Sequence, residues 1–135
     1  MGAWDTDPFG NDTAGDWTYD LEETEDLSLI KSTIQNLLDI GEDYLDASDA
    51  EEVIAAADTL ARLKGNFYIR NAYTRIVDEW VAKYKLVPPQ HLIDSAVQAI
   101  ARILTPPSEL FELWQETEDF EAWRNHLEEL KQRLQ

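Results

Sequence analysis

The chain has 135 residues, no cysteine and a formal net charge of −17. One domain is expected at this length, and 44% hydrophobic residues with five tryptophans are typical of a folded protein. The lack of cysteine excludes a disulfide framework, a zinc–thiolate site and a cysteine nucleophile. The excess negative charge disfavours nucleic acids and anionic membranes as partners.

Negative charge is concentrated in the N-terminal part of the chain. Residues 1–52 hold 16 acidic residues and one basic residue, Lys31, which gives a balance of −15. Residues 53–135 hold 12 acidic and 10 basic residues, which gives a balance of −2. Such a field would speed association with a basic protein. The alternative is that the charge only keeps the chain soluble.

The sequence also indicates where the protein resides. No apolar run approaches the roughly 20 residues of a membrane-spanning helix, and the opening residues lack the basic and apolar regions of a signal peptide. We therefore expect a cytoplasmic protein that does not bind membranes.

Residues 1–11 are predicted to form an extended, turn-rich arm. Pro8 and Gly10 interrupt regular structure, but Trp4 and Phe9 carry large apolar rings that favour burial. We expect these two rings to hold the arm against the body of the protein.

Apolar residues spaced by three and four predict a series of helices after the arm. Asn11 or Asp12 can cap the first helix, Asp26 the second and Asn71 the fourth. The expected helices cover about 12–23, 26–41, 48–64, 71–84, 90–104, a short stretch around 110–114, and 119–134. The segment 67–70 is compatible with either an extended link or one more helical turn. The fourth helix is expected to place Tyr73 on its inner face.

The helix at residues 48–64 is expected to be the centre of the fold. Ser48 and Glu51 have the spacing of a capping box, and Gly65 follows the last turn, where glycine commonly ends a helix. Apolar residues cover more than one stripe of this helix, which indicates neighbours on most sides.

The connections are short and no segment alternates between polar and apolar residues. The sequence therefore predicts an all-α fold: a compact single-domain bundle of six or seven helices over residues 1–135, with the arm at 1–11 packed on it. A short solenoid of paired helices is the alternative architecture.

The opening M-G-A-W-D-T-D-P-F-G-N-D-T-A-G-D-W resembles a family of small bacterial proteins, domain of unknown function 4259, that commonly opens M-G-x-W-G-x-G-x-F-x-N-D. The matching residues are Gly2, Trp4, Phe9, Asn11, Asp12, Asp16 and Trp17. Asp5 and Asp7 replace the usual glycines. The resemblance extends through the helix at 48–64 and the last two helices. It implies a bacterial, intracellular, single-domain protein and supplies no established activity.

We predict no catalytic, cofactor-binding or metal-binding residues. Asp5, Asp7 and Asp16 fall at ligand positions of an EF-hand loop, but Phe9 occupies the fifth position and offers no oxygen ligand. The two histidines lie in separate predicted helices outside any metal-binding motif. A set of aromatic residues could line a ligand pocket: Trp4, Phe9, Trp17, Trp80, Trp114 and Trp123. All of them except the two arm residues have core-facing helical spacing, so we expect the set to pack in the core instead.

The acidic link at residues 42–46 is the candidate protein-binding site. It consists of Glu42, Asp43, Tyr44, Leu45 and Asp46. Carboxylates beside two larger side chains suit recognition of a basic surface. In the alternative, Tyr44 and Leu45 turn inward and the acids only keep the link hydrated.

The expected function is non-enzymatic protein binding, with a basic protein as the partner. A specific version is an immunity-like or antitoxin-like inhibitor, because a small acidic helical protein can cover the basic surface of a nuclease. The alternative is a small-ligand-binding protein or an enzyme whose pocket is built from dispersed residues.

Overall fold

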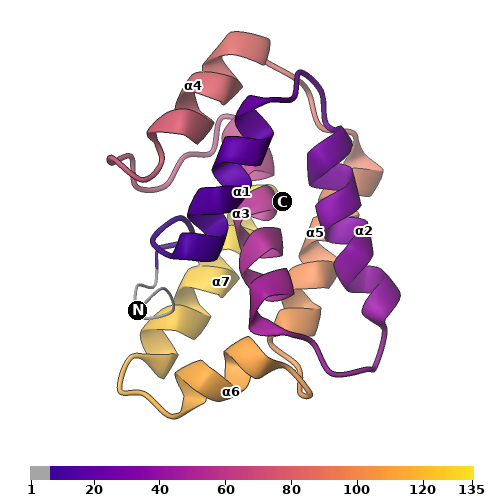
Figure 1. Ribbon diagram of the computed structural model, residues 1–135, viewed down its shortest axis with the longest axis vertical. Coiled ribbons are helices and arrows are strands. Elements are labelled where there is room, and N and C mark those ends of the chain that lie inside the picture. The colour runs from indigo at the N-terminus through magenta and orange to yellow at the C-terminus, as the bar shows by residue number, and fades with distance from the viewer. Residues whose placement is uncertain (1–6) are drawn as a thin grey trace.

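Helix α3, Ala47–Leu63, lies at the centre of the fold (Figure 1). The computed structural model describes residues 7–135, and over these residues the chain forms helices and no strand. The other helices are α1 (Asp12–Glu22), α2 (Ser28–Ile40), α4 (Arg75–Tyr84), α5 (Gln90–Ile103), α6 (Glu109–Gln115) and α7 (Phe120–Leu134). Each of them contacts α3. The predicted all-α bundle is therefore confirmed.

The small side chains of α3 allow this central position. Its buried alanines are Ala50, Ala55, Ala56, Ala57 and Ala61. Alanines let neighbouring helices approach closely. Every helix contributes to one continuous hydrophobic core, whereas the repeats of a solenoid contact only their neighbours. The bundle architecture therefore holds, and the solenoid alternative does not.

The start of α3 differs from the predicted capping box. The helix begins at Ala47, and no side chain of the preceding residue caps it. Instead, the Ala47 backbone N–H donates a hydrogen bond of 2.8 Å to Oε1 of Glu109, at the start of α6. Glu51 is buried and is hydrogen-bonded by Thr13. A residue distant in sequence therefore replaces the expected local cap.

The start of α1 and the end of α2 agree with the sequence prediction, whereas the start of α2 differs from it. Oδ1 of Asn11 accepts a 2.8 Å hydrogen bond from the Ala14 N–H in the first turn of α1. The N-cap of α2 is Leu27 rather than the predicted Asp26, and it makes no side-chain cap hydrogen bond. Asp26 lies one residue earlier, and its Oδ1 accepts a 3.0 Å hydrogen bond from the N–H of Ser28, the first residue of α2. Gly41 ends α2 with a positive φ of 65°, a conformation that favours glycine.

The segment between α3 and α4 is an extended link, because residues 66–70 are not helical. Oδ1 of Asn71 accepts hydrogen bonds from the N–H groups of Tyr73, at 2.9 Å, and Thr74, at 3.3 Å. Asn71 therefore stabilises the turn before α4 rather than the helix itself. Tyr73 precedes α4 and is 61% exposed, so its predicted place on the inner face of the helix is wrong.

The tryptophans of the described residues are all buried: Trp17, Trp80, Trp114 and Trp123. The indole N–H of Trp17 donates to Oγ1 of Thr33, and that of Trp80 to the carbonyl oxygen of Thr24. The rings of Trp114 and Trp123 are stacked with their centroids 6.1 Å apart. The predicted core packing is confirmed for these residues; Trp4 lies outside the described residues.

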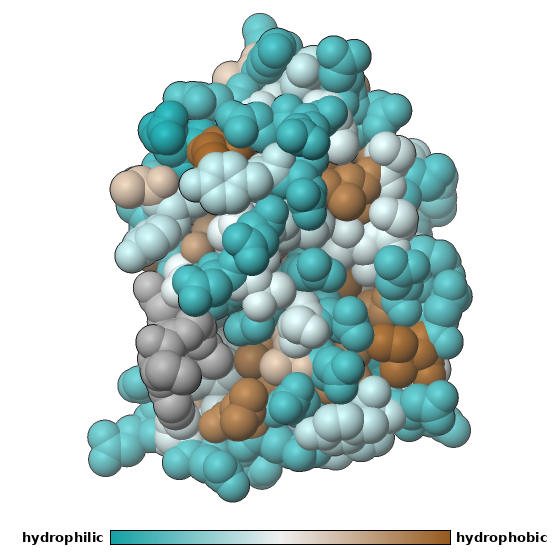
Figure 2. Space-filling model, viewed as in Figure 1, coloured by the Kyte–Doolittle hydropathy of each residue, from teal (hydrophilic) through white to brown (hydrophobic). Residues whose placement is uncertain are grey.

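Paired and unpaired charged groups lie in different parts of the chain. Every ion pair found between residues 7 and 135 lies within residues 58–133. Apart from the buried Glu51 and the partly buried Asp49 and Glu52, the acidic residues of 12–52 are exposed, and none of them has a cationic partner within the described chain. The face in Figure 2 is largely hydrophilic, with small separate hydrophobic patches. Over the described residues, no helix has the length and apolarity needed to cross a membrane.

Candidate protein-binding surface

The link between α2 and α3 is held rigidly by Arg102 of α5. The guanidinium donates hydrogen bonds of 2.7–3.0 Å to four backbone carbonyls, those of Gly41, Asp43, Thr105 and Pro107. These carbonyls belong to the link and to the segment that leads into α6. A single side chain therefore ties together two loops about 60 residues apart, so the link presents a fixed surface.

Leu45 faces inward, which corrects its predicted role as a contact residue. Its side chain is fully buried, and its carbonyl oxygen accepts a 2.8 Å hydrogen bond from the Glu109 N–H. Its own N–H donates to the Pro107 carbonyl at 3.3 Å. Leu45 pairs with the segment before α6 through an isolated bridge to Ser108. It therefore anchors the link and cannot contact a partner.

Tyr44 faces outward and is surrounded by carboxylates. Its side chain is 50% exposed, and its hydroxyl donates a 3.2 Å hydrogen bond to Oε1 of Glu112 in α6. Loss of hydration raises the pKa of Tyr44, and the hydrogen bond to Glu112 and the charges of Glu112, Glu109 and Asp46 raise it further. The hydroxyl is therefore held protonated and fixed among negative charges.

These residues form one surface, which we call the Tyr44 patch. It comprises Glu42, Asp43, Tyr44, Asp46, Glu109 and Glu112. Within the described chain, none of its carboxylates pairs with a lysine, arginine or histidine. Sequence reasoning missed Glu109 and Glu112, because only the fold brings α6 beside the link. An aromatic ring fixed among unpaired carboxylates is suited to binding cationic side chains.

The residues of the opening motif have structural roles where they are described. Phe9 is buried, in a turn closed by a 3.0 Å hydrogen bond from the Gly10 N–H to the Asp7 carbonyl. Asn11 caps α1, and Asp12 is exposed in its first turn. The Asp7 carboxylate accepts a hydrogen bond from Nδ2 of Asn71. Gly2, Trp4 and Asp5 lie outside the described residues.

A buried ion network, which the sequence analysis missed, holds the extended segment between α3 and α4 in place. Arg62 of α3 is 1% exposed. Its Nε lies 2.6 Å from Oδ1 of Asp58, and its Nη1 lies 2.8 Å from Oδ1 of Asp78 in α4. Its Nη2 donates a 2.7 Å hydrogen bond to the Ile69 carbonyl. The guanidinium also lies over the ring of Phe9. Each of its three nitrogens therefore donates a hydrogen bond, and together these bonds hold α3, α4 and the extended segment 66–70 in place.

The same network extends to α7. Nη2 of Arg133 lies 2.6 Å from Oδ2 of Asp58, and its Nε lies 2.6 Å from Oε2 of Glu129. The Asp58 carboxylate therefore bridges two guanidiniums. Because each charge has a partner, the network is a scaffold rather than a reactive centre.

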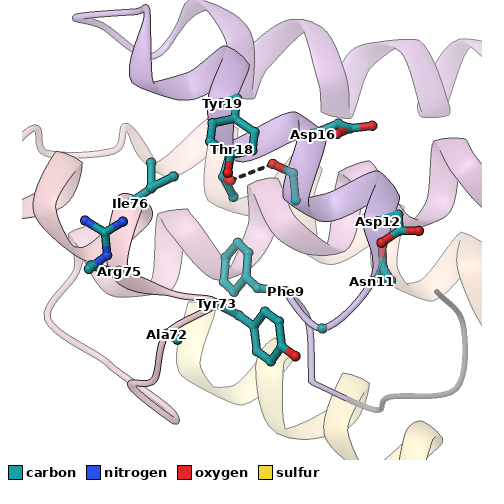
Figure 3. Close-up of a pocket in the computed structure, with 12 residues that line it drawn as sticks. Phe9, Asn11, Asp12, Asp16, Thr18, Tyr19, Ala72, Tyr73, Arg75 and Ile76 are labelled. Atoms are coloured by element: carbon teal, nitrogen blue, oxygen red, sulfur yellow. Dashed lines mark hydrogen bonds between the residues drawn. The ribbon is translucent and has the colours of Figure 1, made fainter. Parts of the chain in front are cut away.

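A cleft of about 630 Å³ opens between α1 and the segment leading into α4. Figure 3 shows Tyr19 and Tyr73 on either side of Phe9, with Asp12 and Asp16 toward one end and Arg75 and Ile76 toward the other. Gly10, Asn11, Gly15, Thr18 and Ala72 complete the lining. Buried Phe9 forms the base, and Arg62 supports it from behind.

Neither histidine lies in a recognisable reactive cluster. His126 contacts Tyr68 edge to face, with ring centroids 5.6 Å apart. His91 is exposed near the start of α5. Within residues 7–135, there is no group of three or more histidine, aspartate or glutamate side chains placed to hold a metal ion.

No match was found among curated proteins or among solved structures. One family model, described as a domain of unknown function (DUF4259), matches residues 2–126. The match covers the opening motif, the link to α3 and the first part of α7. With nearly the whole chain covered, the protein belongs to the DUF4259 family.

Proposed function

We propose that this protein is a non-enzymatic binding module that recognises a basic protein partner through the Tyr44 patch. The observation that carries the proposal is a half-exposed tyrosine fixed among carboxylates that have no cationic partner in the described chain. In a complex, lysine and arginine side chains of the partner would supply the missing cations. The ring of Tyr44 would add apolar contact area at little entropic cost.

The rigidity of the patch supports this function. Arg102 fixes the backbone of the link, and the hydroxyl of Tyr44 is held by Glu112. A preorganised surface loses less conformational entropy on binding than a mobile loop, and this increases affinity. The concentrated negative charge of residues 1–52 would steer a basic protein toward the module.

The setting we propose is the cytoplasm of a bacterium. The specific version of the function is inhibition: the module would cover the substrate-binding surface of a basic enzyme, as an immunity protein or antitoxin does. Its small size and negative charge support this version.

The test is affinity capture from a lysate of the source cell, with the protein and a patch variant as parallel baits. The variant is Tyr44→Ser with Glu112→Gln. The control bait is Glu22→Gln with Glu25→Gln, which alters exposed acids outside the patch. A basic protein retained by the parent and the control but lost from the patch variant supports the proposal. Equal retention of every captured protein by all three baits refutes it.

A further inference from the structure

Gly15 lies inside α1 although the fold does not require glycine there. A Cβ atom added at this position would meet no atom within 4 Å, and the backbone is helical with a negative φ. Glycine in a helix destabilises it by roughly 0.5–1 kcal/mol relative to alanine. Since neither packing nor backbone conformation accounts for Gly15, the bare backbone on the cleft wall is available for close approach by a ligand.

The walls of this cleft carry aromatic rings that the core does not use. Tyr19 and Tyr73 are each 61% exposed, and they flank the buried ring of Phe9 (Figure 3). Tyrosine is enriched in protein-binding surfaces because its ring is rigid and its hydroxyl can form hydrogen bonds. The volume of about 630 Å³ falls within the roughly 300–1,000 Å³ of ligand-binding clefts. The cleft therefore has space and contact surface for a short stretch of chain.

The charges of the lining identify the kind of ligand. Asp12 and Asp16 lie one turn apart on α1, and both are exposed without an ion pair to the described chain. At the other end, Nη1 of Arg75 lies 3.6 Å from Oε2 of Glu79, so the Glu79 carboxylate offsets the charge of Arg75. The lining is therefore negative at the α1 end. A cation is the complementary ligand there.

We propose that this cleft binds an extended segment of a protein that carries a lysine or arginine. The cationic head lies between Asp12 and Asp16, the backbone of the segment passes over Gly15, and Tyr19 and Tyr73 contact it from the two sides. The site involves α1 and α4, whereas the Tyr44 patch involves α6 and the link before α3. It therefore adds a second binding site and does not depend on the patch.

The test is a nuclear magnetic resonance titration of the ¹⁵N-labelled protein with a blocked peptide of alternating lysine and alanine at low salt. The expected result is saturable shifts of the amide signals of the cleft, Gly15 and Tyr73 among them. Shifts spread evenly over the acidic surface, or confined to the Tyr44 patch, would overturn the proposal. Lysinamide titrated in parallel is expected to bind at least about tenfold more weakly, a difference of about 1.4 kcal/mol. If lysinamide binds as tightly as the peptide, the cleft is a site for small cations, and the proposed binding of an extended segment is overturned.

Gly15→Leu distinguishes binding of the peptide in the cleft from nonspecific attraction to the acidic surface, because the substitution leaves every charge unchanged. We expect peptide affinity to fall about tenfold or more, with an unchanged fold by circular dichroism. Ala122→Leu makes the same kind of change at an exposed position of α7 and should bind as the parent does. Undiminished binding by Gly15→Leu would refute the site.

Two further variants keep the proposal testable if Gly15→Leu does not fold. Gly15→Ala should raise the melting temperature and weaken binding. Tyr73→Ser, at an exposed position before α4, should weaken binding severalfold without loss of stability. Parent affinity in both variants would refute the proposal. Tyr44→Ser should leave peptide binding unchanged, so failure of the cleft and failure of the patch are distinguishable.

Discussion

Arg133 in α7 and Asp58 in α3 are 75 residues apart in sequence and form an ion pair with an N–O distance of 2.6 Å. Asp58 is fully buried and also binds Arg62. Two guanidiniums therefore share one carboxylate in the interior, and each has a second carboxylate partner as well. Such an arrangement is stable only while every charge keeps its partner.

Asp58→Asn should destabilise the protein by about 3 kcal/mol or more, because it leaves two buried guanidiniums without the carboxylate between them. Urea unfolding of the parent and the variant measures this loss. The matched control is Glu121→Gln, which breaks the exposed pair with Arg124 and should cost under about 1 kcal/mol. Similar losses in the two variants would contradict the structural role of the buried network.

Phe9→Ala should destabilise the protein by about 3 kcal/mol, because it removes a fully buried ring and leaves a cavity. Deletion of residues 2–10, which also removes this ring, should lower the melting temperature by several degrees. Val87→Ala is the control, since this side chain is 85% exposed and its truncation should change stability by under about 0.5 kcal/mol. An unchanged melting curve after the deletion would show that the arm is not part of the fold.

Glu51→Gln should stabilise the protein near neutral pH and lose this advantage in acid. Burial raises the pKa of Glu51 above the ordinary 4.5, and the charges of Glu109 and Asp12 add to the effect, while the hydrogen bond from Thr13 opposes it. The folded state therefore disfavours the ionised form. Below pH 4.5 the side chain is protonated in both states and imposes no penalty. As pH rises above 4.5 the unfolded chain ionises first, and the penalty is complete above the raised folded pKa.

Thermal melts of parent and Glu51→Gln at pH 4 and pH 7 measure this dependence. Glu25→Gln is the control for the loss of one negative charge, because Glu25 is exposed. The stabilisation by Glu51→Gln relative to this control should be larger at pH 7. A gain that is the same at both pH values would rule out the burial of the Glu51 carboxylate as its cause.

The Tyr44 patch should act on association and dissociation through different residues. Glu42→Gln/Asp43→Asn/Asp46→Asn should slow association with the basic partner at low salt and have little effect at high salt, because exposed charges steer encounter and salt screens them. Tyr44→Ala should instead speed dissociation, with a loss of about 1–2 kcal/mol, because the ring acts as an anchor. Surface plasmon resonance at two salt concentrations separates the two rates.

The control for these kinetics is Glu22→Gln/Glu23→Gln/Glu25→Gln, which makes the same change in net charge at exposed positions outside the patch. A smaller effect on association is expected from this variant. Equal association rates for the patch variant and the parent at both salt concentrations, with folding intact, would remove the link from the interface.

The helices were predictable because their signals are local. A residue three or four positions along a helix lies on the same face, so the spacing of Ile30, Ile34 and Leu37 reports burial directly. Asn11 and Gly41 act within one turn of the helix ends that they determine. The apolar residues that cover more than one stripe of 48–64 likewise indicated the central helix.

The binding surfaces depended on contacts between distant segments. Tyr44 and Leu45 are adjacent in a link without periodicity, and only the hydrogen bonds of Leu45 to residues 107 and 109 turn one side chain outward and the other inward. Side-chain direction in a loop is determined by such partners. The same reason explains why Glu109 replaces a local cap of α3.

The sequence by itself determined an acidic, all-helical protein with a central alanine-rich helix, because composition and period are properties of the chain. Only the tertiary structure decided which acids surround Tyr44, that Asp58 bridges Arg62 and Arg133, and that Tyr19 and Tyr73 face a common cleft. These groups meet across helices that are far apart in sequence. Their proximity follows from the packing around α3, which no local pattern encodes.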